Sequence, residues 1–213
     1  MLSNRQIERY SRQIIAPGFG GVAQERLLAS RIIVIGELDD IEPVLAYLVG
    51  AGIGHINLRI DGGADAIAAL TDRFRDANAD AELTAREVDR GKCGLLFGFA
   101  RDEAGAKRMG SIAAHYADAS IVYARLDSTP MIPIIPAPPP CLACAGLDFD
   151  RPFAGRCDNP DLIAMIAALE AIKILAGIRS TEARLIKFEG YAVSTSPIRQ
   201  RPDRACACTS AAP

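Results

Sequence analysis

A short apolar run followed at once by an amphipathic helix, within residues 31–52, constrains this sequence more than any other stretch. Residues 32–35 (IIVI) are apolar at every position, which is typical of a strand buried on both faces in a parallel sheet. Gly36 begins a turn. After it, apolar residues recur at the spacing of one helical face: Ile41, Val44, Leu45 and Leu48. Strand, tight turn and helix in this order predict the first half of a nucleotide-binding βαβ unit.

The turn carries carboxylates where a nucleotide-binding turn carries glycines. Gly36 is the one glycine of residues 36–42, which include four acids: Glu37, Asp39, Asp40 and Glu42. One carboxylate at roughly 5 Å from one phosphate charge costs about 3 kcal/mol at an effective dielectric near 20. Acids in the first turn also complement the helix dipole, so the simpler interpretation is that they cap the helix. A nucleotide bound here would need a bridging metal ion.

Strand and helix patterns alternate along the next 75 residues or so. The strands are expected at 55–60, 83–88, 94–99 and 120–125, and the helices at 65–77 and 102–117. This order predicts an α/β fold, a Rossmann-like, doubly wound, mostly parallel sheet with helices on both faces. Two short helices at 4–14 and 21–29 form an N-terminal helical arm. The arm has no core of its own, so it must lie across the domain or on a partner.

The pattern changes after residue 130. Prolines among residues 130–140 predict an edge strand at 131–136 that passes into an extended linker. A very apolar helix at 160–177 is expected in the core or in a dimer interface, and strands at 184–189 and 191–195 follow. We therefore expect a single domain in three parts: the helical arm at 1–30, a nucleotide-fold core at 31–136, and a zinc-binding and dimerisation part at 137–213.

Charge and hydropathy exclude several classes of function. The net charge of −2 gives no electrostatic case for nucleic acid or acidic lipid. The polar N-terminus has no signal-peptide pattern, and no apolar stretch is long enough to span a bilayer, so we expect a cytoplasmic protein. In a reducing compartment, its six cysteines point to metal or catalysis before disulfides.

Four of the cysteines form two close pairs, Cys141 with Cys144 and Cys206 with Cys208. Structural zinc sites take four thiolates in a tetrahedron, and two such pairs supply them. The predicted zinc would fasten the C-terminal segment to the proline-rich linker. Four free thiols, or a disulfide in each pair, are the alternatives.

The other cysteines and both histidines are weaker candidates. Cys93 lies beside a buried strand and is expected in the core. Cys157 lies just before a helix N-terminus, where a thiolate is stabilised, so it is a weak candidate for a reactive group. His55 and His115 lie on separate elements and form no evident triad, so we expect structural roles for them.

Motifs along almost the whole chain resemble the ThiF/MoeB/HesA family, the bacterial relatives of ubiquitin-activating enzymes. They are residues 9–15 (RYSRQII), 17–20 (PGFG), 24–27 (QERL), 30–31 (SR), 47–48 (YL), 51–54 (AGIG) and 171–177 (AIKILAG), with both cysteine pairs. The resemblance implies a fold that binds ATP and adenylates the C-terminal glycine of a ubiquitin-fold sulfur carrier. It also implies a dimer and a zinc ion held by Cys141, Cys144, Cys206 and Cys208, although the second pair is one residue tighter than usual.

The ATP-binding residues of the family do not carry over. Its glycine-rich turn is replaced by residues 37–42, and its ribose-binding acid aligns with Ile60, beside Asp61. Its magnesium-binding Asp should lie near Arg101, and Asp102 is one place off. Gly36, Asp61 and Asp102 are thus only weak candidates for nucleotide or metal contacts. Losing these ligands together argues against ATP and magnesium binding, because phosphoryl chemistry needs positioned cations and donors.

One family residue that contacts a dimer partner is retained in this sequence. The resemblance implies that Arg12, the second arginine of the R-Y-x-R-Q motif, reaches the nucleotide site of a dimer partner. Its alternative role is an ion pair at the dimer interface.

The leading hypothesis is a degenerate, non-catalytic family member. It would serve as a zinc-containing dimer subunit or docking module for a ubiquitin-fold sulfur carrier, a peptide or an active family partner, in a homodimer or heterodimer. The alternative is an active ATP-dependent adenylyltransferase that acts on the C-terminal glycine of such a carrier. A third possibility is a scaffold that binds a peptide along the edge strand expected near 131–136.

Overall fold

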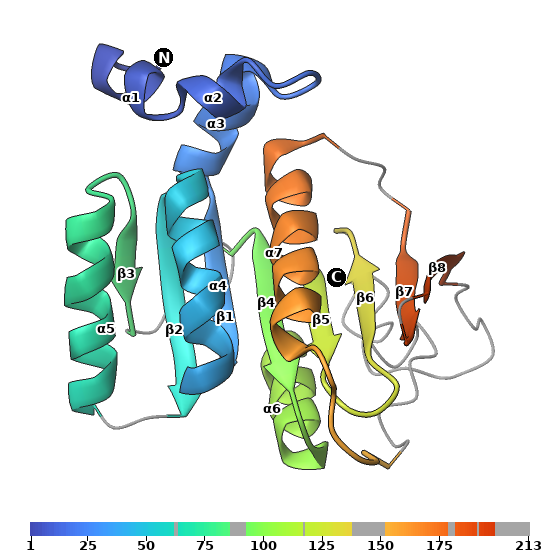
Figure 1. Ribbon diagram of the computed structural model, residues 1–213. Coiled ribbons are helices and arrows are strands. Elements are labelled where there is room, and N and C mark those ends of the chain that lie inside the picture. The colour runs from blue at the N-terminus through green and yellow to red at the C-terminus, as the bar shows by residue number, and fades with distance from the viewer. Residues whose placement is uncertain are drawn as a thin grey trace, which may run out of the picture.

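The computed structural model describes residues 1–61, 64–85, 93–116, 118–137, 152–178, 182–190 and 192–198. Its centre is an eight-stranded sheet in the order β3-β2-β1-β4-β5-β6-β7-β8 (Figure 1). The strands are β1 (Arg31–Glu37), β2 (His55–Asp61), β3 (Glu82–Thr84), β4 (Leu95–Ala100), β5 (Ser120–Arg125), β6 (Met131–Ile135), β7 (Arg184–Glu189) and β8 (Ala192–Pro197). The helices are α1 (Asn4–Arg9), α2 (Ser11–Ile14), α3 (Gly20–Ala29), α4 (Leu38–Ala51), α5 (Ala64–Ala77), α6 (Glu103–Ala113) and α7 (Pro160–Ala176).

The sheet is parallel in its first half and antiparallel in its second. Strands β1 to β5 run in the same direction, with Val34 of β1 between Leu58 of β2 and Phe97 of β4. Strands β6, β7 and β8 are antiparallel to their neighbours. Because β1 is flanked by β2 and β4, the strand order reverses between β1 and β4. Ligands of open α/β sheets bind at the carboxyl ends of the strands at this reversal.

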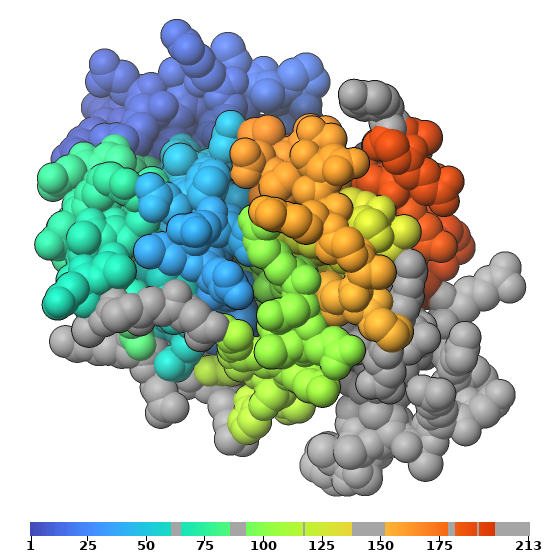
Figure 2. Space-filling model, turned by 60° about the horizontal axis from the view of Figure 1, so that its bottom comes forward, coloured from blue at the N-terminus to red at the C-terminus, as the bar shows by residue number. Residues whose placement is uncertain are grey.

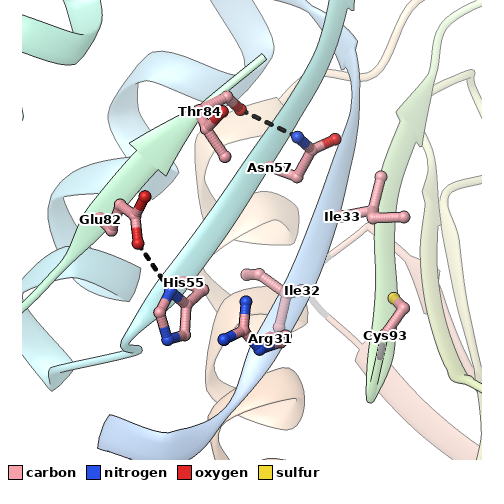
Figure 3. A pocket seen from close by; sticks show the side chains of 8 residues that line it. All are labelled: Arg31, Ile32, Ile33, His55, Asn57, Glu82, Thr84 and Cys93. Carbon is pink, nitrogen blue, oxygen red and sulfur yellow. Dashed lines mark hydrogen bonds and ion pairs between the residues drawn. The ribbon is translucent and has the colours of Figure 1, made fainter. Parts of the chain in front are cut away.

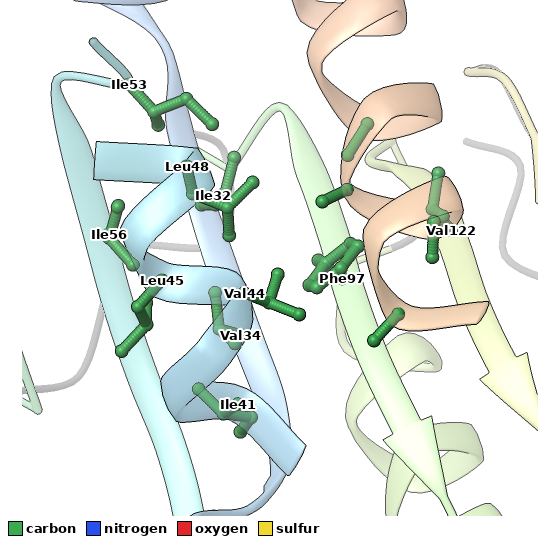
Figure 4. Close-up of a cluster of buried hydrophobic side chains, with 14 of the residues drawn as sticks. Ile32, Val34, Ile41, Val44, Leu45, Leu48, Ile53, Ile56, Phe97 and Val122 are labelled. Carbon is green, nitrogen blue, oxygen red and sulfur yellow. The ribbon is translucent and has the colours of Figure 1, made fainter. Parts of the chain in front are cut away.

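Helices cover both faces of the sheet, as the sequence predicted. On one face, α4 and α7 pack on the sheet around Ile32, Val34 and Phe97 (Figure 4). On the other face, Ile33, Ile35 and other strand residues pack against Met109 of α6. Successive residues of a strand point to opposite faces, so the apolar run in β1 supplies both cores. This confirms the Rossmann-like, mostly parallel α/β fold.

The N-terminal arm lies across the domain, at the amino-terminal ends of the parallel strands (Figure 1). Its buried Tyr10 is in hydrogen-bond contact with Asn78 and donates to Asp80, which ties the arm to the segment after α5. Gln13 and Gln24 both donate to the carbonyl of Ala51 at the end of α4. The family-like motifs at 9–15 and 51–54 therefore meet in one contact.

Gly52 is required at that contact for two reasons. Its φ of +86° lies in the left-handed region, and a Cβ there would come within 2.7 Å of the Tyr10 ring and of the Gln24 amide. Any other residue would strain the backbone and displace the arm. Gly52 therefore allows the N-terminal arm to pack against the end of α4.

The expected edge strand at 131–136 is wrong. Strand β6 lies inside the sheet, paired with β5 on one side and β7 on the other. Pro133 is tolerated because it pairs with Leu185 of β7 but falls in a gap of the β5 ladder, between the pairs Val122–Ile134 and Arg125–Met131. Proline therefore marked an interrupted ladder and not an edge. Among the described strands, the edges of the sheet are β3 and β8.

Helix α7 is only partly buried. It begins at Pro160 and ends before Gly177, which adopts the left-handed conformation, as expected from the sequence. One side is buried and rich in alanine, whereas an exposed stripe carries Leu162, Met165 and Leu169. Within the residues that the structure describes, no helix combines the length and apolar character needed to cross a bilayer.

Candidate functional site

The candidate site lies where the strand order reverses, at the carboxyl ends of β1 and β4. The turn from β1 into α4 and the turn from β4 into α6 face each other across this crevice. It is lined by Ile35, Gly36, Glu37, Asp40, Phe99, Ala100, Arg101, Asp102, Gly105 and Arg108. A ligand of this fold would contact the first turns of both helices, where free backbone N–H groups favour anions.

The β1–α4 turn packs tightly against β4. Gly36 has a φ of +152°, and a Cβ there would lie 3.4 Å from both Ile41 and the Cβ of Phe99. Glu37 is the residue that precedes α4, and its side chain makes no capping hydrogen bond. The glycine therefore serves the close packing of this turn on β4, which is a structural reason for its presence without any nucleotide.

Asp40 and Arg101 form an ion pair across the crevice. The Arg101 Nε donates to both carboxylate oxygens of Asp40, at 2.7 and 2.9 Å, and its Nη2 donates to Oδ1 as well. Asp40 is buried in the first turn of α4, whereas the Arg101 side chain is 38% exposed. Such a fork-shaped contact fixes the relative position of the two turns.

The pair also sets the charge of the crevice. The hydrogen bonds to Asp40 raise the pKa of Arg101 above its ordinary value, and Glu37 adds to this attraction. The guanidinium therefore stays charged, and the buried carboxylate is neutralised from within the chain. Asp40 thus does more than cap α4, which was the simpler interpretation of the acidic turn.

The remaining space is small. The part of the crevice lined by described residues holds a cavity of about 10 Å³. That is about enough for one water molecule, whereas small-molecule sites typically measure about 300–1,000 Å³. As the side chains stand, the described part of the crevice holds much less space than a nucleoside triphosphate needs.

Of the weak candidates for nucleotide contacts, two lie in the crevice and the third ends β2. Asp102 is the N-cap of α6, and its carboxylate accepts the N–H of Gly105 at 2.8 Å. Asp61 ends β2, opposite Glu37 of β1, and its side chain lies outside the described residues. Gly36 and Asp102 therefore share the crevice, and each has a structural role there.

Cys157 lies near the same edge of the sheet, in the segment that leads to α7. Burial raises the pKa of its thiol above the ordinary value, which outweighs a backbone hydrogen bond at Asn159 and the positive charge of Arg101. Burial therefore opposes the thiolate stabilisation expected at the helix start, and a reactive role for Cys157 stays a prediction. A thiol with a raised pKa forms less of the nucleophilic thiolate.

A buried ion pair holds this segment against β5. Arg125 and Asp127 are almost fully buried and pair at 2.7 Å. Arg125 also donates to the carbonyl of Pro152, and its guanidinium stacks 3.8 Å from the ring centroid of Phe153. The segment before α7 is thus fastened to the carboxyl end of β5.

Arg12 is remote from the crevice in its own chain. It lies on α2, at the amino-terminal ends of the strands, whereas the crevice is at their carboxyl ends (Figure 1). Its side chain is exposed and, among the described residues, has no hydrogen bond or ion pair. Arg12 can therefore reach such a crevice only in another molecule.

The four cysteines of the predicted zinc site, Cys141, Cys144, Cys206 and Cys208, lie outside the described residues. In the described ranges no group of three or more histidine, cysteine, aspartate or glutamate side chains is placed to hold a metal ion. The zinc site stays a prediction.

A second cavity, of about 50 Å³, lies at the amino-terminal ends of β1 and β2 (Figure 3). It contains His55, which pairs with Glu82 at 3.0 Å, and Cys93, whose pKa burial raises to about 11. The other histidine, His115, contacts the carbonyl of Ser111 in its own helix. These contacts explain both histidines and Cys93 structurally.

Sequence reasoning missed the Asp40–Arg101 pair, although both residues drew attention separately. The signal was available: in the Rossmann strand order the turns after β1 and β4 are adjacent, and the turn after β4 begins with Arg101, a base that can face the acids of the first turn. Reading the two turns together predicts the ion pair that fills the crevice.

No family model matches the chain. It is 26% identical to the vegetative protein HesA of Trichormus variabilis, over 96% of this chain and 90% of that protein. It is 43% identical to the adenylyltransferase and sulfurtransferase UBA4 of Lodderomyces elongisporus over 65 residues, 30% of this chain. The second match spans only 14% of that relative's length.

The fold is similar to that of solved enzyme structures. The E. coli protein MccB, crystallised with MccA-N7isoASN, superposes with a TM-score of 0.68 at 14% sequence identity. The superposition covers 95% of this chain and 75% of MccB.

Proposed function

The chain is a member of the ThiF/MoeB/HesA family, and we propose that it is a non-catalytic one, a docking subunit that has lost ATP binding. Its partner would be a ubiquitin-fold sulfur carrier, a peptide or an active member of the family. The single observation that carries this proposal is the Asp40–Arg101 ion pair, which occupies the crevice at the carboxyl ends of β1 and β4.

The charges of the crevice support the loss of nucleotide binding. An acid, Asp40, stands where the family resemblance implies a glycine-rich turn, and a base, Arg101, stands where it implies a magnesium ligand. To admit a triphosphate, Arg101 would have to leave Asp40 buried and unpaired beside further negative charge. Each such carboxylate–phosphate approach costs about 3 kcal/mol at roughly 5 Å and an effective dielectric near 20.

The alternative, an active adenylyltransferase, would need Asp102 as a metal ligand. The carboxylate of Asp102 already accepts the N–H of Gly105 at the start of α6. Binding a metal would therefore compete with the N-cap, which is worth about 1 kcal/mol. We find no specific observation among the described residues that favours the active enzyme.

The proposed partners follow from the names of similar proteins. One solved neighbour is MccB in complex with MccA, and one relative is called a sulfur carrier protein adenylyltransferase. A chain that keeps this fold without its ATP crevice would retain surfaces for such partners. We propose that recognition, and not activation, is what it contributes.

A dimer would give Arg12 a role. Leu162, Met165 and Leu169 of α7 and Tyr47 of α4 are exposed apolar side chains. The two helices lie side by side (Figure 2), so these side chains could form one apolar face. If two copies, or a copy and an active relative, packed through this face about a two-fold axis perpendicular to the strands, their strands would be antiparallel. The arm of one molecule would then lie toward the crevice end of the other.

Calorimetry with magnesium and ATP tests the proposal. We expect no detectable heat from the purified chain at nucleotide concentrations up to about 1 mM. Micromolar binding, on the order of −8 kcal/mol, would overturn the proposal and favour the enzyme.

Pyrophosphate exchange, measured with a panel of carriers ending in Gly-Gly and with peptide substrates, tests the chemistry directly. Exchange above background would contradict a non-catalytic role if it is lost in Asp102→Asn. Exchange that Asp102→Asn leaves unchanged would also contradict the proposal, unless a mock preparation without the chain gives the same exchange and so identifies a contaminating enzyme.

A further inference from the structure

The sheet ends in a strand with an open edge. Strand β8, Ala192–Pro197, pairs with β7 on one side, and no strand of the described chain pairs with its other side. All six of its residues are exposed. The outer row of N–H and C=O groups can therefore pair with a further strand.

Natural proteins protect such edges, and within the described residues this strand lacks the usual protection. Charged side chains, bulges, prolines and short strands commonly prevent unwanted pairing. The opposite edge is protected by length, because β3 has only three residues. Strand β8 has six residues with no charge, and its one proline, Pro197, is at the end. An accessible edge of this kind is suited to strand addition.

The two faces of β8 differ in chemistry. Val193 and Thr195 lie opposite Phe188 and Ile186 of β7, two buried residues of the core on the α7 side. Val193 is nevertheless 58% exposed, so it extends the apolar face beyond the last covered strand. The remaining residues of β8 are alanine, serine and proline. The edge would therefore favour an added strand with an apolar side chain beside Val193, and it would place few other requirements on the sequence of that strand.

The size of the edge points to a peptide and not to a second copy. A strand of six residues spans about 20 Å. Pairing over this length buries on the order of a few hundred Å² per partner, below the roughly 1,200–2,000 Å² total of a stable interface. Such a contact can hold an extended segment, but two whole domains need more.

We propose that β8 is a docking edge for an extended, uncharged peptide segment, which adds to the sheet as a ninth strand with an apolar side chain next to Val193. This rests on the docking role proposed above and places it on a specific edge. It also moves peptide binding away from residues 131–136, which lie inside the sheet. Backbone hydrogen bonds supply the affinity, and the position of the apolar side chain supplies the selectivity.

The test titrates the full chain with a labelled, uncharged octapeptide of alternating valine and threonine. The control probe is the same peptide N-methylated at every second residue, which removes hydrogen-bond donors and keeps the side chains. We expect the first probe to bind with an affinity of about 10–500 μM and the control probe at least about tenfold more weakly.

Val193→Lys places a charge on the edge and should weaken binding of the first probe at least about tenfold. Val22→Lys is the matched control, because Val22 is 65% exposed on α3, and it should leave the affinity unchanged. Amide NMR shifts of the wild-type chain should be largest in residues 192–197. Circular dichroism establishes that both variants are folded.

Several results would overturn the proposal: no binding at about 1 mM, equal binding of both probes, equal binding by Val193→Lys, or NMR shifts centred on another element. Sedimentation that shows a dimer lost in Val193→Lys would also overturn it, since the occupant would then be a second copy. Calorimetry with ATP tests the proposed loss of ATP binding independently of peptide binding. Failure of peptide binding with no ATP heat would remove only the docking edge.

Discussion

At the scale of single residues, the Asp40–Arg101 pair is the main polar contact of the crevice at the carboxyl ends of β1 and β4. Asp40 is 6% exposed and accepts two hydrogen bonds from Arg101 Nε, so the pair is better ordered than a surface ion pair. Removal of one partner leaves a buried charge without compensation, which costs more than the pair itself contributes.

A double-mutant cycle should therefore give a large coupling energy. We expect Arg101→Met to lower the unfolding free energy by about 2 kcal/mol, which is below the roughly 3–5 kcal/mol of a fully buried pair because Arg101 is 38% exposed. Asp40→Asn combined with Arg101→Met should restore about 1 kcal/mol or more relative to the sum of the single changes. Urea denaturation measures each value.

The exposed pair Asp72–Arg75 on α5 is the control for this cycle. Its side chains are 69% and 65% exposed and lie 2.7 Å apart. We expect a coupling energy of no more than about 0.5 kcal/mol for this pair. Equal coupling in the two cycles would contradict the special role of the crevice pair.

At the scale of elements, the sequence identifies most helices and strands. Both β1 and α4 carry unambiguous patterns, and α7 has Pro160 at its start and Gly177 at its end. The position of β6 could not be predicted, because its neighbour β7 comes from residues 184–189, about 50 positions later in the sequence. A proline indicates that a backbone N–H donor is missing from the strand, but it does not indicate which strand pairs with it.

The sequence predicted where the candidate site lies, but it did not predict the ion pair inside it. The strand–turn–helix pattern located the crevice, and its acids indicated that a phosphate would be disfavoured. The ion pair requires strand order as well as sequence, because Asp40 and Arg101 are 61 residues apart. Likewise, the pKa of Cys157 depends on how deeply its segment packs, which the helix-start pattern does not report.

An ion-pair cluster joins α7 to β7 and should make stability depend on pH. Burial disfavours the charge on Glu170, but the hydrogen bond from Lys173 and the charge of Arg184 outweigh it and lower the pKa of Glu170. The unfolded chain thus binds a proton more readily than the folded chain. The contribution is complete above the unfolded pKa of about 4.5 and is lost as pH falls through the lower folded value.

Glu170→Gln should reduce the loss of stability as the pH falls below about 5. We expect the variant to be less stable than wild type at pH 7 and to lose less stability between pH 5 and pH 3, by thermal denaturation across that range. Glu103→Gln, which removes an exposed partner of Lys107 on α6, should leave the slope unchanged. Parallel curves for wild type and Glu170→Gln would show that Glu170 does not carry the effect.

At the scale of the whole molecule, the exposed stripe on α7 predicts association. Leu169 is 50% exposed and lies between other apolar side chains of α7, so a charge there should disrupt a dimer packed through this face. We expect wild type to sediment as a dimer and Leu169→Glu as a monomer. Val193→Glu, a change at a side chain of β8 that is 58% exposed, should stay dimeric. A wild-type monomer would contradict the prediction.

Metal analysis tests the predicted zinc site. We expect about one zinc per chain, lost in Cys141→Ser and in Cys206→Ser and retained in Cys157→Ser, whose thiol lies outside the proposed ligand set. Thiol titration of the denatured, metal-free protein separates the alternatives. Six reactive thiols without zinc would indicate free cysteines, and two would indicate a disulfide in each close pair.

The contact between the two turns also has a consequence for motion. Asp40 belongs to the first turn of α4, and Arg101 immediately precedes the N-cap of α6. Neither helix start can open without breaking the same ion pair, so the two starts should behave as one cooperative unit. Their backbone amides should exchange with deuterium at matched opening free energies, and Arg101→Met should accelerate exchange at both starts together.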